Sequence, residues 1–167
     1  MSEAAYRLER VHIPLGLDVE CVMAEVRQGR HPGYVDMRPL RPSDFTATVP
    51  RPDVDYDLVD VDLGHDLLDV APAQARLAIE AAGRSPLTLD EGVAIVLAHP
   101  GILRAANCFQ MLGSSAGDRR VPSLWVTSQG RVRLGWCWEG MPHTWLGAAS
   151  CARRERTVAH GVWAESG

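Results

Sequence analysis

The stretch VPSLWVTSQGRVRLGWCWEGMPHTWLGAAS, residues 121–150, decides the fold. It contains three runs in which apolar and polar residues alternate, and two short segments of turn-forming residues separate them. These segments are Gln129-Gly130 and residues 139–142, which read EGMP. Alternation bounded by such residues is typical of antiparallel strands joined by hairpins. The pattern therefore predicts a three-stranded antiparallel meander.

The register of this meander predicts which side chains share a face. If Gln129-Gly130 is a two-residue turn, Trp125 lies opposite Leu134, and the second connection places Trp136 opposite Trp145. One face then carries Trp125, Val132, Leu134, Trp136, Trp138, His143 and Trp145. The other face carries Leu124, Val126, Arg131, Arg133, Cys137 and Thr144. A shift of the register by one residue would invert this assignment.

Two helices are expected before the meander. Pro72 suits the first turn of a helix that ends before Gly83. Thr88 and Glu91 have the spacing of a capping box, and the apolar stripe that follows predicts a helix over 88–99. Further elements expected from the pattern are a helix within 17–28 and strands at 34–38, 57–63 and 108–112.

Together these elements predict an α+β fold in which an antiparallel sheet ends in the meander and the helices pack on one of its faces. A single domain is expected over residues 1–152, a length that suits one hydrophobic core. Residues 153–167 are charged and weakly patterned, so they are expected to form a flexible tail, with Trp163 able to dock back.

Composition argues against several classes of protein. The 167 residues carry a net charge of −4, and their basic residues are scattered, which disfavours nucleic-acid binding. No apolar run has the roughly 20 residues of a membrane helix, and no secretory signal is visible, so a cytoplasmic location is expected. The four cysteines form no C-x-x-C pair, and the sequence contains no dinucleotide or phosphate-loop motif. We therefore expect no metal and no cofactor.

The loop end of the meander is the place where the sequence suggests a site. Trp138 and His143 lie beside the connection, where burial is least complete, and an indole next to an imidazole can stack a flat ligand or hold a cation. The residues expected to bind such a ligand are Trp125, Trp136, Trp138, Trp145, Arg119 and Arg120. His143 and Glu139 are the candidates for acid–base work, since an imidazole titrates near neutral pH.

Structural explanations remain open for each of these features. The tryptophan face can simply form the core under the helices, with His143 as a structural residue. The acidic stretch 53–69 lacks the glycine and glutamate of a calcium loop and suits a solvated face. The loop 113–120, GSSAGDRR, can cradle an anion with its amides and two arginines, or can be a plain connection.

Several strings resemble a known family. They are GRSPLTLDEG at 83–92, NCF at 107–109, VPSLWV at 121–126 and LGWCWEGMPHTWLG at 134–147. Together they resemble an uncharacterised, mainly actinobacterial domain of unknown function, over roughly residues 57–152. The resemblance implies a shared fold and a bacterial, cytoplasmic origin, and it carries over no catalytic residue.

Two classes of function follow from the sequence. The first is action on a small molecule, as a binding protein or a small tailoring enzyme of specialised metabolism, through an aromatic pocket that contains His143. The alternative is a non-catalytic protein-interaction module that uses an exposed tryptophan-rich patch. Depth distinguishes the two, since a concave site walled by His143 favours the first and a flat apolar patch favours the second.

Overall fold

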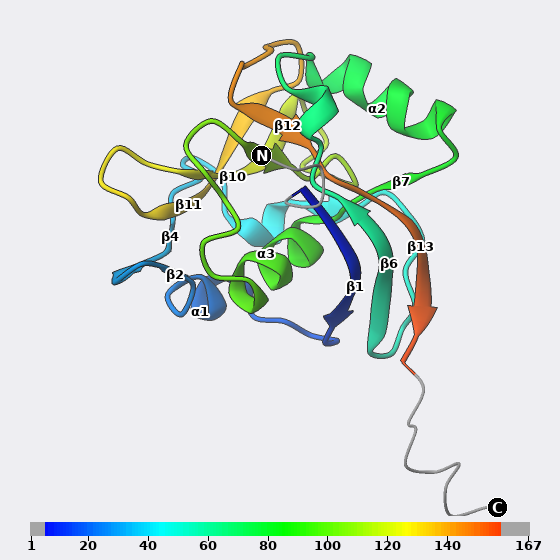
Figure 1. Cartoon of the computed structure of the whole chain (residues 1–167), viewed down its shortest axis with the longest axis horizontal. Helices are drawn as coiled ribbons and strands as arrows, with labels where there is room; N and C mark the ends of the chain where they lie inside the picture. The colour runs from blue at the N-terminus through cyan, green and yellow to red at the C-terminus, as the bar shows by residue number, and fades with distance from the viewer. Residues whose placement is uncertain (1–5, 158–167) are drawn as a thin grey trace, which may run out of the picture.

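The first sheet brings together strands from distant parts of the chain (Figure 1). The computed structural model describes residues 6–157. In spatial order the strands of this sheet are β1 (Arg7–Ile13), β6 (Tyr56–Asp62), β13 (Ser150–Arg156) and β7 (Ser85–Pro86). All their pairings are antiparallel. Residues 153–156, expected in a flexible tail, belong to β13, whereas 158–167 and Trp163 lie outside the described residues.

The second sheet contains the predicted hairpin, in a different setting. Its strands, in spatial order, are β12 (Leu146–Ala148), β8 (Cys108–Gln110), β10 (Arg120–Val126), β11 (Val132–Trp138) and β4 (Tyr34–Val35). β10 and β11 pair antiparallel as predicted, but β4 and β12 each pair parallel to a neighbour. The α+β class is confirmed, but the single antiparallel sheet expected from the sequence is wrong: residues 6–157 form two main sheets, and one of them is mixed.

The third strand of the expected meander does not return beside β11. β12 instead pairs with β8, at the opposite edge of the sheet. Backbone hydrogen bonds hold the connection between β11 and β12 in another place. Ala73 N–H donates to the Glu139 carbonyl at 3.1 Å, and Asp69 N–H donates to the His143 carbonyl at 2.8 Å. These bonds fix residues 139–143 against the start of the second helix, so the chain crosses the sheet before it pairs again.

The register of the hairpin differs by one residue from the expected one. Trp125 lies opposite Arg133, not Leu134. The turn is longer than two residues: Thr127 N–H donates to the Arg131 carbonyl at 2.8 Å, and Gly130 has a φ of 76°. A three-residue loop with a left-handed glycine is a common hairpin connection. Because it adds one residue, it moves Trp125 to the opposite face from Trp136 and Trp138.

The helices lie in different places and do not share one face of a sheet. α3 (Leu89–Ala98) begins at Thr88, whose capping box with Glu91 is confirmed, and it contacts both β1 and β10. Its residues are buried over most of its surface, as expected for a helix that is apolar all round. α2 (Pro72–Ala81) contacts β7 and β12 instead (Figure 1).

The remaining elements are short. α1 (Val19–Met23) is shorter than the helix expected in 17–28, because the chain pairs as β2 from Arg27. The other elements are β2 (Arg27–Gln28), β3 (His31–Pro32), η2 (Pro42–Asp44), β5 (Thr46–Ala47), η3 (His65–Leu67) and β9 (Ser114–Ser115). Between residues 6 and 157, no helix combines the length and apolarity needed to cross a membrane.

Candidate functional site

The tryptophans of the hairpin region form two clusters on opposite faces of the sheet. Trp136 and Trp138 meet edge to face, with ring centroids 4.8 Å apart. Trp125 meets Trp145 at 6.0 Å, and the His143 ring lies 5.0 Å from Trp145. The expectation that all four indoles and the imidazole share one face is therefore wrong, because the register of the hairpin is shifted.

The indoles of the first cluster already hold a cation from the protein itself. The guanidinium of Arg120 lies 4.8 Å from the Trp136 ring and 5.3 Å from the Trp138 ring. Asp118 fixes this guanidinium through a contact of 2.8 Å. The Trp136 ring nitrogen donates to the Met37 carbonyl at 3.0 Å. Arg120 and Trp136 are thus committed to internal contacts, and Trp138 remains 47% exposed.

A hollow beside Trp138 brings together part of the expected site. Its volume is about 510 Å³, and its lining residues are Ala73, Arg119, Trp138, Glu139, Gly140 and Met141. Arg119 and Glu139 form a long ion pair of 3.8 Å across it. Three of the expected site residues therefore meet here. His143 is not among the lining residues, so the expected pairing of indole and imidazole is not formed at this end.

The second cluster is held by close packing. A Cβ atom on Gly135 would lie 2.4 Å from the Trp125 ring, so only glycine leaves room for the indole across the strand. Arg133 lies over the same ring at 4.8 Å and donates to the Asp36 carbonyl at 2.9 Å. Trp125 and Trp145 thus pack against neighbouring side chains, and His143 lies at the margin of this packing.

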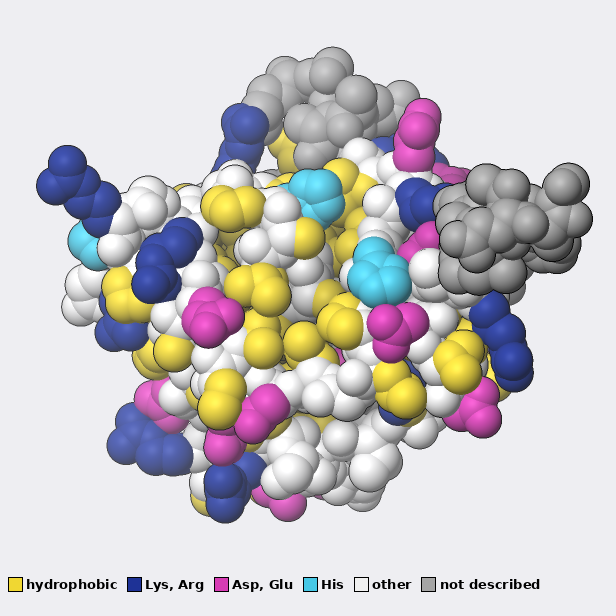
Figure 2. All heavy atoms as spheres, turned by 90° about the horizontal axis from the view of Figure 1, so that it is seen from below, with side chains coloured by type: hydrophobic (Ala, Val, Ile, Leu, Met, Phe, Trp, Pro, Cys, Tyr) yellow, Lys and Arg dark blue, Asp and Glu magenta, His cyan; other side chains and the backbone are white. Residues whose placement is uncertain are grey.

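A larger cavity, which we call the arginine groove, lies between α1, β4 and η2. It has a volume of about 750 Å³. Its lining residues are Glu20, Ala24, Pro32, Gly33, Tyr34, Val35, Asp36, Met37, Arg38, Leu40, Arg41, Pro42 and Arg131. Figure 2 views the molecule from the side on which α1 lies, and hydrophobic side chains gather in the middle of that face with charged ones around them.

Two of the three guanidinium groups in the arginine groove are paired with carboxylates. Arg38 binds Asp36 through two nitrogens at 2.8 and 2.7 Å, and these hydrogen bonds are the main reason that the pKa of Asp36 is lowered to about 2. Arg41 binds Glu20 at 3.1 Å. Arg131 differs, because within the described residues no carboxylate oxygen lies within ion-pair distance of it.

A smaller hollow adjoins the arginine groove, and a further hollow adjoins that one. A hollow of about 360 Å³ shares Glu20, Arg41 and Pro42 with the groove, and adds Leu17 and Phe45. A third, of about 450 Å³, shares Asp90 with the second. Burial raises the pKa of Asp90 despite an ion pair with Arg51 at 3.5 Å.

Sequence patterns do not reveal the arginine groove. Its residues come from three separated segments, and the segment after Pro39 has the composition of a loop. The one local signal is the spacing of Asp36 and Arg38, which lie two residues apart and pair in the structure. Such a pair is common on protein surfaces and points to no site by itself.

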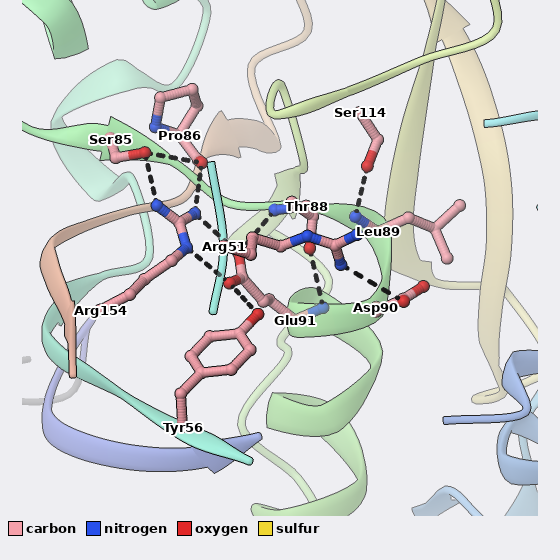
Figure 3. A network of polar contacts seen from close by, with 10 residues as sticks. All are labelled: Arg51, Tyr56, Ser85, Pro86, Thr88, Leu89, Asp90, Glu91, Ser114 and Arg154. Atoms are coloured by element: carbon pink, nitrogen blue, oxygen red, sulfur yellow. Dashed lines mark hydrogen bonds and ion pairs between the residues drawn. The ribbon is translucent and has the colours of Figure 1, made fainter. Parts of the chain in front are cut away.

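A second arginine–carboxylate cluster is sealed inside the protein (Figure 3). The carboxylate of Glu91 accepts hydrogen bonds from Arg154 at 2.7 and 2.8 Å, from the Thr88 backbone at 2.8 Å, and from the Tyr56 hydroxyl. Arg154 also donates to the Ser85 hydroxyl at 2.7 Å. The cluster joins α3, β6, β7 and β13. It is satisfied internally, so we assign it a structural role.

The structure also bears on metal binding and on the reactivity of two thiols. Within residues 6–157, no group of three or more histidine, cysteine or acidic side chains is arranged to hold a metal ion. In the acidic stretch, Asp57 binds Arg10 and His12, both at 3.0 Å. Burial raises the pKa of the Cys108 and Cys151 thiols to about 11, which makes both poor nucleophiles.

Comparison with known proteins places the chain in a family. The model of a family of unknown function, DUF5701, matches residues 10–157, which includes most of the first strand as well as the tryptophan-rich region. No curated protein and no solved structure is significantly similar to the chain. The match covers most of the sequence, and the chain therefore belongs to the DUF5701 family.

Proposed function

We propose that the protein binds a small molecule in the arginine groove. The observation that carries the proposal is a cavity of about 750 Å³ whose apolar lining is interrupted by a few charged groups. Sites for small ligands are commonly concave, mostly apolar and provided with a few convergent polar groups. The resemblance to actinobacterial sequences supports a bacterial, cytoplasmic setting, and specialised metabolism is a fitting source for the ligand.

The lining of the arginine groove suits binding better than catalysis. The described residues that line it include no histidine, cysteine or serine. Its carboxylates, Asp36 and Glu20, are both engaged by arginines, and a carboxylate with a pKa of about 2 is a weak base at neutral pH. A general base or a nucleophile poised for chemistry is thus not evident there, and we assign the groove to recognition.

A thermal-shift screen with a panel of metabolites tests the proposal. A true ligand raises the melting temperature of the wild-type protein. Ala24 is exposed and lines the groove, so Ala24→Trp places a large ring in the cavity without removing any of its charged groups, and the ligand-induced shift is lost. Ala78→Trp, on the exposed face of α2, is the matched control and retains the shift. Ligands that stabilise both variants equally bind elsewhere and contradict the proposal.

The hollow beside Trp138 supports a second candidate, a protein-interaction surface. Trp138 and Met141 are exposed there, and Leu77 is exposed on α2 one turn after Ala73. Tryptophan, methionine and arginine are enriched where proteins bind one another. A Trp138→Ala variant in the same screen separates the candidates. A metabolite panel that stabilises nothing, together with self-association that Trp138→Ala abolishes, favours the interaction surface.

A further inference from the structure

We infer that the ligand of the arginine groove is an amphipathic monocarboxylate whose carboxylate is held by Arg131. This inference rests on the proposed function and deepens it, because it names the chemical class of the ligand. It depends on three features of the groove: the fixed position of the Arg131 guanidinium, the balance of charges around it, and the apolar surface next to it.

The guanidinium of Arg131 is held in place before any ligand arrives. It lies over the Tyr34 ring, 4.2 Å from the centroid, and its Nε donates to the Pro32 carbonyl at 2.9 Å. Both contacts use the face and one edge of the planar group. The two terminal nitrogens are left to form the paired hydrogen bonds that a carboxylate accepts from an arginine. A fixed donor also loses less side-chain entropy when the ligand binds.

The charges around the arginine groove favour a single negative charge on the ligand. Three arginines and two carboxylates line it, which leaves one positive charge in excess. Arg38 and Arg41 are engaged by Asp36 and Glu20. Arg131 therefore supplies the excess charge. A dianion such as a phosphate would meet the same guanidinium but would be repelled more strongly by the two carboxylates.

The surface beside Arg131 is apolar, so the rest of the ligand should be hydrocarbon. Tyr34, Val35, Met37 and Leu40 line the cavity, and Pro42 continues it into the second hollow. An apolar chain or ring that lies along these residues gains free energy from the surface it removes from water. A carboxylate at one end and an apolar body along the groove thus match the two kinds of surface present.

A titration followed by NMR tests this inference with three probes: 4-phenylbutyrate, its neutral amide and 3-phenylpropyl phosphate. The carboxylate is expected to shift the backbone resonances of Gly33, Tyr34 and Val35, and to bind about tenfold more tightly than the amide, because it adds a charge-assisted pair of hydrogen bonds. If the phosphate probe bound more tightly than the carboxylate probe, the anionic group of the ligand would be a phosphate and not a carboxylate. Equal affinity of carboxylate and amide would overturn the inference and leave the proposed function standing.

Two variants locate the charge that recognises the carboxylate. Arg131→Gln lowers the affinity for 4-phenylbutyrate to that of the amide and leaves the affinity for the amide unchanged, whereas Arg153→Gln, at an exposed arginine on β13 outside the groove, changes neither affinity. Tyr34→Leu keeps the charge of Arg131 but removes the ring over which its guanidinium lies, so part of the affinity for 4-phenylbutyrate is lost. Spectra of each variant report whether the fold is intact. If no probe shifts the groove resonances while a screening hit is lost in Ala24→Trp, the ligand class is wrong and the function stands.

Discussion

The sealed cluster around Glu91 and the arginine groove use the same chemical groups in opposite surroundings. In the sealed cluster the side chains of Arg154 and Glu91 are 7% and 0% exposed. In the groove, Arg38 and Arg41 are 87% and 71% exposed, although each also binds a carboxylate. The sealed pair contacts four elements of the fold, whereas Asp36 and Arg38 pair within one short segment, and Glu20 and Arg41 join two segments at the surface.

This difference teaches where an arginine is part of the scaffold and where it is available to a ligand. A buried charge that loses its partner is left without solvation, so the sealed pair resists exchange. An exposed ion pair contributes little to stability, because water and salt compete with it. The exposed pairs of the groove therefore contribute little to the stability of the fold, whereas the Glu91 pair is part of its scaffold.

The largest effect that the comparison predicts follows removal of Arg154. Arg154→Met leaves the buried Glu91 without its cation and should lower the free energy of unfolding by about 3–5 kcal/mol. Urea denaturation at neutral pH measures the loss. The neighbouring Arg153→Met, whose ion pair with Glu155 is exposed, should cost less than about 1 kcal/mol. Similar losses in the two variants would remove the distinction between the clusters.

Tyr56 offers a smaller effect with a characteristic dependence on pH. Tyr56→Phe removes a hydrogen bond to a buried carboxylate and should cost about 1–3 kcal/mol at neutral pH. Burial, followed by the charge of Glu91, raises the pKa of Tyr56 above its ordinary value. The stabilisation by the hydroxyl is therefore complete below the unfolded pKa of about 10 and is lost as the pH rises toward the folded pKa.

The difference in stability between wild type and Tyr56→Phe should accordingly shrink at alkaline pH. Urea denaturation of both proteins at neutral pH and at about pH 11 gives the comparison. The double variant with Arg153→Met serves as a control, since the two changes are expected to add. A difference that is constant, or that grows with pH, would show that the hydroxyl is not bound to a buried carboxylate.

The smallest expected effect belongs to the open pairs. Hydrogen bonds from Arg38 lower the pKa of Asp36 to about 2, so the contribution of this pair to stability is present above the ordinary pKa and fades as the pH falls toward 2. Arg38→Gln should raise the pKa of Asp36 toward its ordinary value of about 4, and should cost less than about 1 kcal/mol at neutral pH. An NMR titration of the Asp36 carboxyl measures the change in its pKa, and urea denaturation measures the loss of stability.

Local sequence signals predicted the helices and strands of this fold better than they predicted which strands pair with each other. The capping box at Thr88 and the hairpin around Gln129-Gly130 are both confirmed, because each depends on residues a few positions apart. The register failed by one residue, since a three-residue loop and a two-residue turn read alike in sequence. The parallel pairs β11–β4 and β12–β8 join distant segments, and no local pattern encodes them.

Only the part of the candidate site whose residues belong to a single hairpin could be predicted from the sequence. Arg119, Trp138 and Glu139 meet in one hollow because they lie at adjoining ends of the hairpin strands. Arg131 was expected on the face opposite the tryptophans, but its position over Tyr34 depends on the parallel pairing of β4 with β11. The structural importance of Arg154 was missed for a related reason: β13 carries a charged sequence that resembles a tail.

The position of β13 has a consequence for how the chain folds during its synthesis. β13 lies between β6 and β7, so these earlier strands are held in one sheet only through it. It also carries the cation that neutralises Glu91. While residues 150–156 are still inside the ribosomal exit tunnel, the first sheet lacks its central strand and a carboxylate in the interior lacks its partner. Completion of this core must therefore wait until that segment has emerged.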